Sequence, residues 1–157
     1  AQHGLFVSAV LHHFTRLVPA LELANFYHLV NPMGIFISRG PAVQETPLAD
    51  VFRLYRLAFP GQVVPLEVRS PALVEDILTL DAACLRTSAG DWLFLANRSR
   101  EEKIEVDIDD FATPWEGALL VGASPQEPFD KDQVAARGGK LSLPPLSIAR
   151  LKLKVGA

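Results

Sequence analysis

Residues 91–111, DWLFLANRSREEKIEVDIDDF, indicate the fold of this chain more clearly than any other segment. Their first part, residues 92–96, is a continuous apolar run, which is typical of a strand buried on both faces. In the last part, apolar and acidic side chains alternate, which is typical of a strand with one face in solvent. Residues 97–101 form a polar turn of hairpin length between the two. The segment therefore predicts a β-hairpin inside a β-sandwich.

Short strands are expected throughout the sequence that follows Gly61. Turn signals rich in Gly, Pro, Ser and Asp separate them at regular intervals. The candidate strands are residues 63–68, 78–87, 92–96, 103–109, 119–122, 141–143 and 148–155. Seven short strands predict a mainly β chain, with an antiparallel β-sandwich of the jelly-roll or Greek-key type.

Charges alternate on two of these strands with opposite sign. If the two strands are neighbours, the charges are expected to form an exposed cross-strand ladder. The acidic set is Glu105, Asp107 and Asp109, and the basic set is Arg150, Lys152 and Lys154. A solvated strand face fits the acidic set better than a calcium site, because no glycine-containing ligand loop is present.

The first sixty residues follow a different pattern. Helical spacing over residues 4–18 predicts a helix that ends at Pro19. The largely apolar residues 21–30 predict a buried strand. Thr46 and Pro47 are a helix cap and a first-turn proline, and they predict a second helix that stops before Pro60.

Helix, buried strand and helix are the pattern of an α/β protein, and a buried parallel strand needs parallel neighbours. Residues 1–60 are therefore expected to be a piece of a larger α/β domain. Residues 61–157 are expected to be a sandwich domain that is stable alone. An uncovered strand edge is expected to fold back or to pair with a second copy, so a homo-oligomer is predicted.

Composition excludes several classes of function. The chain is 49% hydrophobic and 21% charged, as in ordinary globular proteins, and its net charge of −3 does not suit a nucleic-acid partner. Its apolar runs are shorter than the ~18 residues of a membrane span. The apolar residues 5–11 lack a signal-peptide pattern, so a cytoplasmic location is expected. No cofactor or metal is expected, because the histidines lack ligand spacing and Cys84 has no partner cysteine.

Several motifs occur in an order that resembles the C-terminal region of glycoside hydrolase family 51, the α-L-arabinofuranosidases. The resemblance covers nearly the whole chain. The motifs are Tyr27-His28-Leu29-Val30-Asn31, Gly61-Gln62-Val63-Val64, Ser70-Pro71, Leu80-Asp81-Ala82-Ala83, Ala96-Asn97-Arg98-Ser99 and Leu143-Pro144-Pro145-Leu146-Ser147. It implies the last two helices and the eighth strand of a (β/α)8 barrel, followed by a C-terminal β-sandwich. Residues 21–30 would be that strand.

The resemblance also implies where the chemistry lies. A retaining glycosidase uses two carboxyl groups ~5–5.5 Å apart, and in the family these lie on barrel strands four and seven, before residue 1. Residues 26–31 contain no carboxylate, and Glu22 is at the wrong end of the strand. No catalytic residue is therefore expected in this chain. His28 stands where the family has a glutamine that contacts the arabinofuranosyl ring, so it is the expected substrate-binding residue; local packing of His28 is the alternative.

For the other candidate site residues, the sequence favours or allows a structural role. Trp115 is the only candidate platform for stacking a sugar, and a buried plug at the end of the sandwich is the alternative. His12 and His13 are expected to face solvent, Asn31 to shape a turn, and Cys84 to be a small buried residue. Three functions follow: the C-terminal part of an α-L-arabinofuranosidase that acts on arabinofuranoside-containing oligosaccharides, a carbohydrate-binding module, or a non-catalytic oligomerisation domain.

Overall fold

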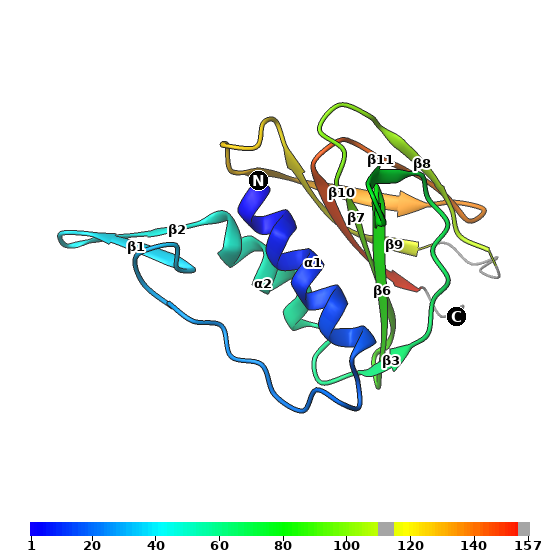
Figure 1. The fold of residues 1–157 in the computed structure, drawn as a ribbon, viewed down its shortest axis with the longest axis horizontal. Coiled ribbons are helices and arrows are strands. Elements are labelled where there is room, and N and C mark those ends of the chain that lie inside the picture. The colour runs from blue at the N-terminus through cyan, green and yellow to red at the C-terminus, as the bar shows by residue number, and fades with distance from the viewer. Residues whose placement is uncertain (110–114, 154–157) are drawn as a thin grey trace.

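The computed structural model describes residues 1–109 and 115–153. Its centre is a twisted, six-stranded antiparallel sheet (Figure 1). In spatial order the strands are β10 (Phe129–Ala136), β9 (Trp115–Gly122), β12 (Ser147–Leu153), β7 (Gly90–Asn97), β6 (Leu80–Thr87) and β3 (Gln62–Val64).

Helices cover one face of this sheet and shorter strands cover the other (Figure 1). The helices are α1 (Gln2–Arg16) and α2 (Pro47–Arg56). On the opposite face β8 (Ile104–Asp107) pairs with β11 (Lys140–Leu143). Two further pairs are β1 (Phe36–Arg39) with β2 (Ala42–Glu45), and β4 (Ala72–Val74) with β5 (Ile77–Leu78). The prediction of a mainly β, antiparallel sandwich preceded by a helical segment is confirmed.

Local signals explain both helices. The Thr46 side chain accepts a hydrogen bond from the backbone N–H of Leu48 at 3.3 Å, and Pro47 occupies the first turn of α2. Helix α1 ends at Arg16, shortly before Pro19. In the described residues, no helix has the length and apolar character needed to cross a membrane.

Strand β7 is buried on both faces, as its apolar run predicts. Its side chains alternate between two cores. Trp92, Phe94 and Ala96 belong to the core beneath the helices. Leu93 and Leu95 belong to the core between the large sheet and the β8–β11 pair. The large sheet therefore contributes to two cores.

The predicted hairpin between residues 92–96 and 104–108 is wrong. Strand β7 pairs with β6 and β12, whereas β8 pairs with β11 in the other layer. Asn97 explains the difference, because its side-chain amide donates hydrogen bonds to the carbonyls of Glu102 at 2.8 Å, Leu143 at 3.1 Å and Pro144 at 2.8 Å. These bonds tie the connection after β7 to the loop before β12. Asn97 is fully buried.

Replacing Asn97 with Ala is expected to lower the free energy of unfolding by about 2–3 kcal/mol, because buried carbonyls would lose their donors. Urea unfolding followed by circular dichroism measures this change. Asn31→Ala is the matched control, since Asn31 also bonds to backbone but is exposed, and its loss should stay below about 1 kcal/mol. Equal losses for the two variants would contradict the role of Asn97.

The predicted ladder of opposite charges is also wrong. Strand β12 lies between β7 and β9, and β8 lies in a different sheet. Arg150 and Lys152 instead lie over the Trp92 ring, 5.4 and 5.1 Å from its centroid. Glu105 pairs with Lys103 at 2.8 Å. Lys154 and the end of the predicted strand at Val155 lie outside the described residues.

The predicted buried strand over residues 21–30 is wrong as well. This segment forms no strand, and only Val30 makes an isolated bridge, to Phe36. Leu23 and Tyr27 are 74% and 81% exposed. A parallel strand takes its hydrogen bonds from parallel neighbours, and the described residues supply none beyond that bridge. The division into residues 1–60 and 61–157 stays a prediction, although α1, α2 and the large sheet share one core.

Candidate functional site

The loop that contains His28 has an unusual backbone. His28, Asn31 and Met33 have φ values of 67°, 28° and 58°, in the left-handed region that non-glycine residues rarely adopt. Such strain persists only where surrounding structure enforces it, and it is frequent at binding sites. Here Asn31 holds the loop: its side chain donates to the carbonyl of Ser38 at 3.1 Å and accepts from the Ser38 N–H at 3.0 Å. The prediction that Asn31 shapes the turn is confirmed.

The His28 side chain is partly buried against Tyr27, with their ring centroids 3.8 Å apart. Within the described part of the chain, the imidazole of His28 makes no hydrogen bond. Both ring nitrogens are therefore free to bond to a ligand. Tyr27 beside it is one of the most exposed large side chains.

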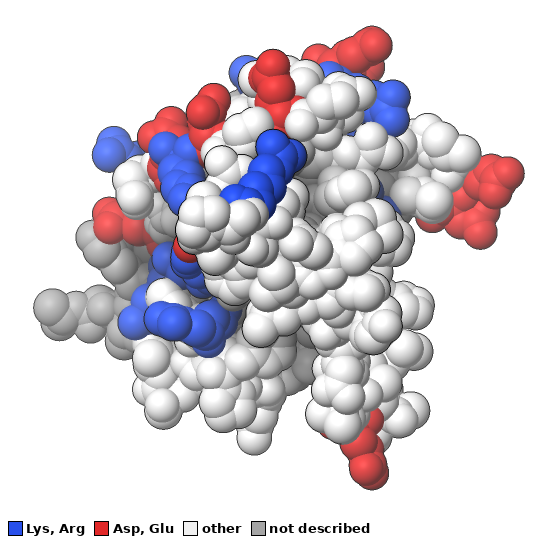
Figure 2. All heavy atoms as spheres, turned by 90° about the vertical axis from the view of Figure 1, so that its left-hand side faces the viewer, with Lys and Arg blue, Asp and Glu red and all other residues white. Residues whose placement is uncertain are grey.

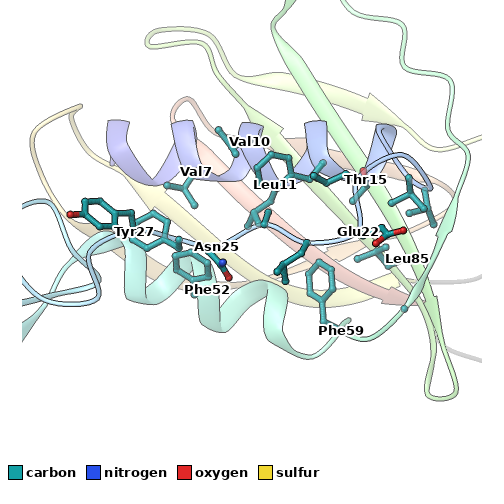
Figure 3. A pocket seen from close by; sticks show the side chains of 18 of the residues that line it. Val7, Val10, Leu11, Thr15, Glu22, Asn25, Tyr27, Phe52, Phe59 and Leu85 are labelled. Carbon is teal, nitrogen blue, oxygen red and sulfur yellow. The ribbon is translucent and has the colours of Figure 1, made fainter.

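In the described residues, the two glutamates that flank this loop in sequence either lie away from it or are already paired. Figure 3 shows Glu22 and Tyr27 at opposite ends of one cavity. Glu45, at the end of the β1–β2 hairpin, forms an ion pair with Arg53. Across residues 1–109 and 115–153, no group of three or more His, Cys, Asp and Glu side chains could hold a metal ion.

The cavity has a volume of about 580 Å³ and lies between α1, α2 and residues 21–27. Its lining is largely apolar and includes Phe14 from α1 and Phe26 from the crossing segment. Phe52 of α2 also lines it (Figure 3). Phe26 meets Phe52 edge to face, with centroids 5.1 Å apart. Its polar lining residues are few, namely Thr15, Glu22, Asn25 and Tyr27, whereas a sugar site typically has several convergent polar groups.

The surface around this cavity is also poor in charge. Viewed from the side of the hairpin and helices, the molecule shows a continuous area without Lys, Arg, Asp or Glu (Figure 2). Large apolar side chains from residues 1–60 are exposed, including Phe6, Val18, Leu23, Leu29, Met33, Val43 and Phe59. Contiguous exposed apolar surface is typical of faces that contact another protein, a ligand or a membrane.

Trp115 and Cys84 have structural roles. Trp115 is fully buried in the core between the two β layers, so the interpretation as a sugar platform is wrong and the interpretation as a buried plug is supported. Cys84 is buried as expected, and burial raises the pKa of its thiol to about 11. The thiol is therefore protonated and unreactive at neutral pH.

The expectation that His12 faces solvent is wrong, whereas His13 is exposed as predicted. His12 is fully buried between α1, α2 and β6. Its Nδ1 lies 3.2 Å from a carboxylate oxygen of Asp81, and its Nε2 lies 2.5 Å from the hydroxyl of Tyr55. That hydroxyl lies 2.7 Å from the Ser8 hydroxyl. The chain of groups resembles a catalytic relay, but its members are buried without access for a substrate.

Asp81 is the charged centre of this buried cluster. Its carboxylate also forms ion pairs with Arg16 and Arg98. Burial alone would raise the pKa of Asp81, but the contacts with His12, Arg16 and Arg98 outweigh it and hold the pKa well below its ordinary value. A signal for this cluster was present in the sequence, because Asp81 is the lone charge in the apolar residues 80–85, and such a charge needs partners.

No protein-family model and no curated protein matches the sequence. Solved structures do match. The family 51 α-L-arabinofuranosidase from Thermotoga petrophila RKU-1 superposes with a TM-score of 0.84 at 18% identity, over 96% of this chain and 38% of that chain.

Two further structures extend this result. The α-L-arabinofuranosidase from Thermotoga maritima, solved with arabinose, has a TM-score of 0.81 at 17% identity, over 97% of this chain and 38% of that chain. The catalytic domain of the family 30 xylanase C from Talaromyces cellulolyticus has a TM-score of 0.56 at 16% identity, over 78% of this chain and 27% of that one. The chain thus spans well under half of these enzymes. It has the fold of the C-terminal region of the family 51 α-L-arabinofuranosidases.

Proposed function

We propose that this chain is the C-terminal part of an α-L-arabinofuranosidase, an enzyme that removes terminal α-L-arabinofuranosyl groups from oligosaccharides with retention of configuration. The observation that carries the proposal is the superposition on the Thermotoga petrophila enzyme over 96% of this chain. The sequence motifs in family order support it independently. The weaker match to a family 30 xylanase supports glycoside hydrolysis more broadly.

In this proposal the sandwich is a structural support and not a sugar-binding module. Both tryptophans, which a binding module would present to sugars, are buried. The apolar face of α1, α2 and residues 21–30 would pack against the remainder of the barrel. That remainder would supply the parallel neighbours that residues 21–30 lack, together with the two catalytic carboxylates.

His28 is the proposed sugar contact of this chain. Two features support this role: its imidazole has unoccupied hydrogen-bonding capacity, and a strained loop fixes its position. One imidazole nitrogen would bond to a hydroxyl of the arabinofuranosyl ring. In a longer protein that contains this chain, His28→Ala should therefore raise KM for an aryl α-L-arabinofuranoside, whereas His13→Ala should not.

A second function is favoured by the apolar surface in Figure 2. An exposed face of this kind also suits a non-catalytic domain that assembles copies of the protein. Sedimentation velocity distinguishes the assembly function from the enzyme function. A stable oligomer of this chain, which also forms in a longer protein without hydrolase activity, would favour assembly.

A cytoplasmic location, expected from the sequence, stays a prediction.

The purified chain alone is expected to show no hydrolysis of an aryl α-L-arabinofuranoside above the buffer rate. The reason is that residues 26–31 contain no carboxylate and Glu22 lies at the far end of an apolar cavity. Release of the aryl group is measured by absorbance, with a longer protein that contains this chain as the positive control. Turnover by the chain alone would contradict the proposal, as would an inactive, folded longer protein.

A further inference from the structure

The buried cluster around Asp81 joins the helical layer to the large sheet. His12 and Arg16 come from α1, Asp81 comes from β6, and Arg98 follows β7. Tyr55 of α2 joins the cluster through His12. Helix α1 lies against β6, β7 and β12 (Figure 1). The polar contacts of the cluster lie within this otherwise apolar contact. The cluster therefore lies where the two layers must separate if α1 is to leave the sheet.

The contacts suit a neutral His12. Nδ1 faces the Asp81 carboxylate, which favours the ring proton on that nitrogen. Nε2 then accepts a hydrogen bond from Tyr55, and the Tyr55 oxygen accepts one from Ser8. Burial raises the pKa of Tyr55, so its hydroxyl keeps the proton that this arrangement needs. If Nε2 also carried a proton, that proton would face the hydroxyl proton of Tyr55. Tyr55 would then have to accept from His12 and donate to Ser8, so both hydrogen bonds would reverse direction.

Charge also disfavours a proton on His12. The groups that face it are the Asp81 carboxylate, the guanidinium groups of Arg16 and Arg98, and the neutral Tyr55 hydroxyl. One negative charge already faces two positive charges. A protonated His12 would add a third positive charge in a fully buried position.

We propose that His12 and Asp81 form an acid-sensitive lock that holds α1 on the sheet while His12 is neutral and loosens when His12 takes up a proton. Most of the exposed apolar side chains lie in residues 17–43, which connect α1 to α2, so the lock sets how firmly one end of that apolar segment is attached to the sandwich. The device does not depend on the enzyme activity proposed above.

The direction of the pH effect follows from the cluster. Burial lowers the pKa of His12 below its unfolded value of 6.5, although Asp81 opposes the shift. As the pH falls, His12 therefore takes up its proton at a higher pH in the unfolded chain than in the folded chain. The lock contributes fully to the free energy of unfolding above about pH 6.5, and its contribution decreases as the pH falls below this value. Asp81 also has a lowered pKa, but its stabilising contribution is lost only below about pH 4. Of these two groups, His12 is therefore the one whose contribution changes between about pH 6.5 and pH 4, and the comparison with a His12 variant isolates it.

The test is urea unfolding of the chain from pH 7.5 to 5, compared with His12→Gln and His13→Gln. In the unchanged chain and in His13→Gln, the His12 contribution should raise the unfolding equilibrium constant by up to about tenfold per pH unit below 6.5. His12→Gln should lose that contribution. His13 is a matched control because it is the exposed neighbour on the same helix. Equal pH slopes in the chain and in His12→Gln would overturn the proposal.

Two measurements on the unchanged chain decide the matter even if His12→Gln does not fold. In a proton NMR titration, the His12 ring should titrate below its ordinary pKa of 6.5. Amide hydrogen exchange is measured at pH 7.5 and at pH 5.5, and protection factors are corrected for the intrinsic effect of pH. Between these values, the protection of α1 should fall more than that of β12. A His12 ring that titrates at or above 6.5, or unchanged protection of α1, would overturn the lock.

Discussion

Removal of residues 1–58 is expected to abolish the folded monomer at 25 °C. The helices cover Trp92, Phe94, Leu120 and Ile148 on one face of the large sheet. Burial of each such side chain contributes about 1.5–3 kcal/mol, so exposing all four removes a free energy comparable to the ~5–15 kcal/mol stability of a whole domain. Circular dichroism during heating, and the mass from light scattering, measure the outcome.

The truncation also decides where the domain boundary lies. A chain of residues 59–157 that remains monomeric and unfolds cooperatively would support the division at residue 61 that the sequence predicts, and would contradict a core shared with the helices. Phe6→Ser in the full chain is the control, because Phe6 is 68% exposed on α1. This variant should fold normally.

Replacement of Phe94 with Ala is expected to cost about 3–5 kcal/mol of unfolding free energy, because a buried ring would leave a cavity. Phe94 is fully buried, and its ring stacks on Tyr55 with centroids 4.2 Å apart and planes 9° apart. It therefore contacts α2 directly from β7. Urea unfolding at pH 7.5 measures the loss.

Phe6→Ala is the matched control for Phe94→Ala, since it removes the same ring from an exposed position. Its effect should stay within about 0.5 kcal/mol. A loss for Phe94→Ala that is no larger than this control would contradict the packing of the helices on the sheet.

Elements with local signals were predictable from the sequence. The cap at Thr46 predicts the start of α2, and the apolar run from Trp92 predicts a strand buried on both faces. The partner of that strand was not predictable in the same way, because strand pairing is set by distant contacts. Asn97 bonds to carbonyls of residues 102, 143 and 144 and directs the chain to the other layer. Strand β10 was missed because most of its side chains are exposed and polar.

The buried strand that composition predicts for residues 21–30 was also wrong. Their apolar character predicts burial, but burial in a strand requires neighbours that the described residues do not provide. The cluster around Asp81 was missed for a similar reason, since its partners come from α1, α2 and the connection after β7. The assignment of His28 to sugar binding depends on a ligand, so the fold alone does not test it.

The stereochemistry of hydrolysis is the decisive test of the proposed α-L-arabinofuranosidase activity. A longer protein that contains this chain is incubated with an aryl α-L-arabinofuranoside, and proton NMR follows the anomeric signal of the first arabinose released. Retaining chemistry through two carboxylates predicts that α-arabinofuranose forms first and then equilibrates with the other forms. Initial release of the β-anomer, or cleavage of aryl xylosides without cleavage of the arabinofuranoside, would contradict a retaining α-L-arabinofuranosidase.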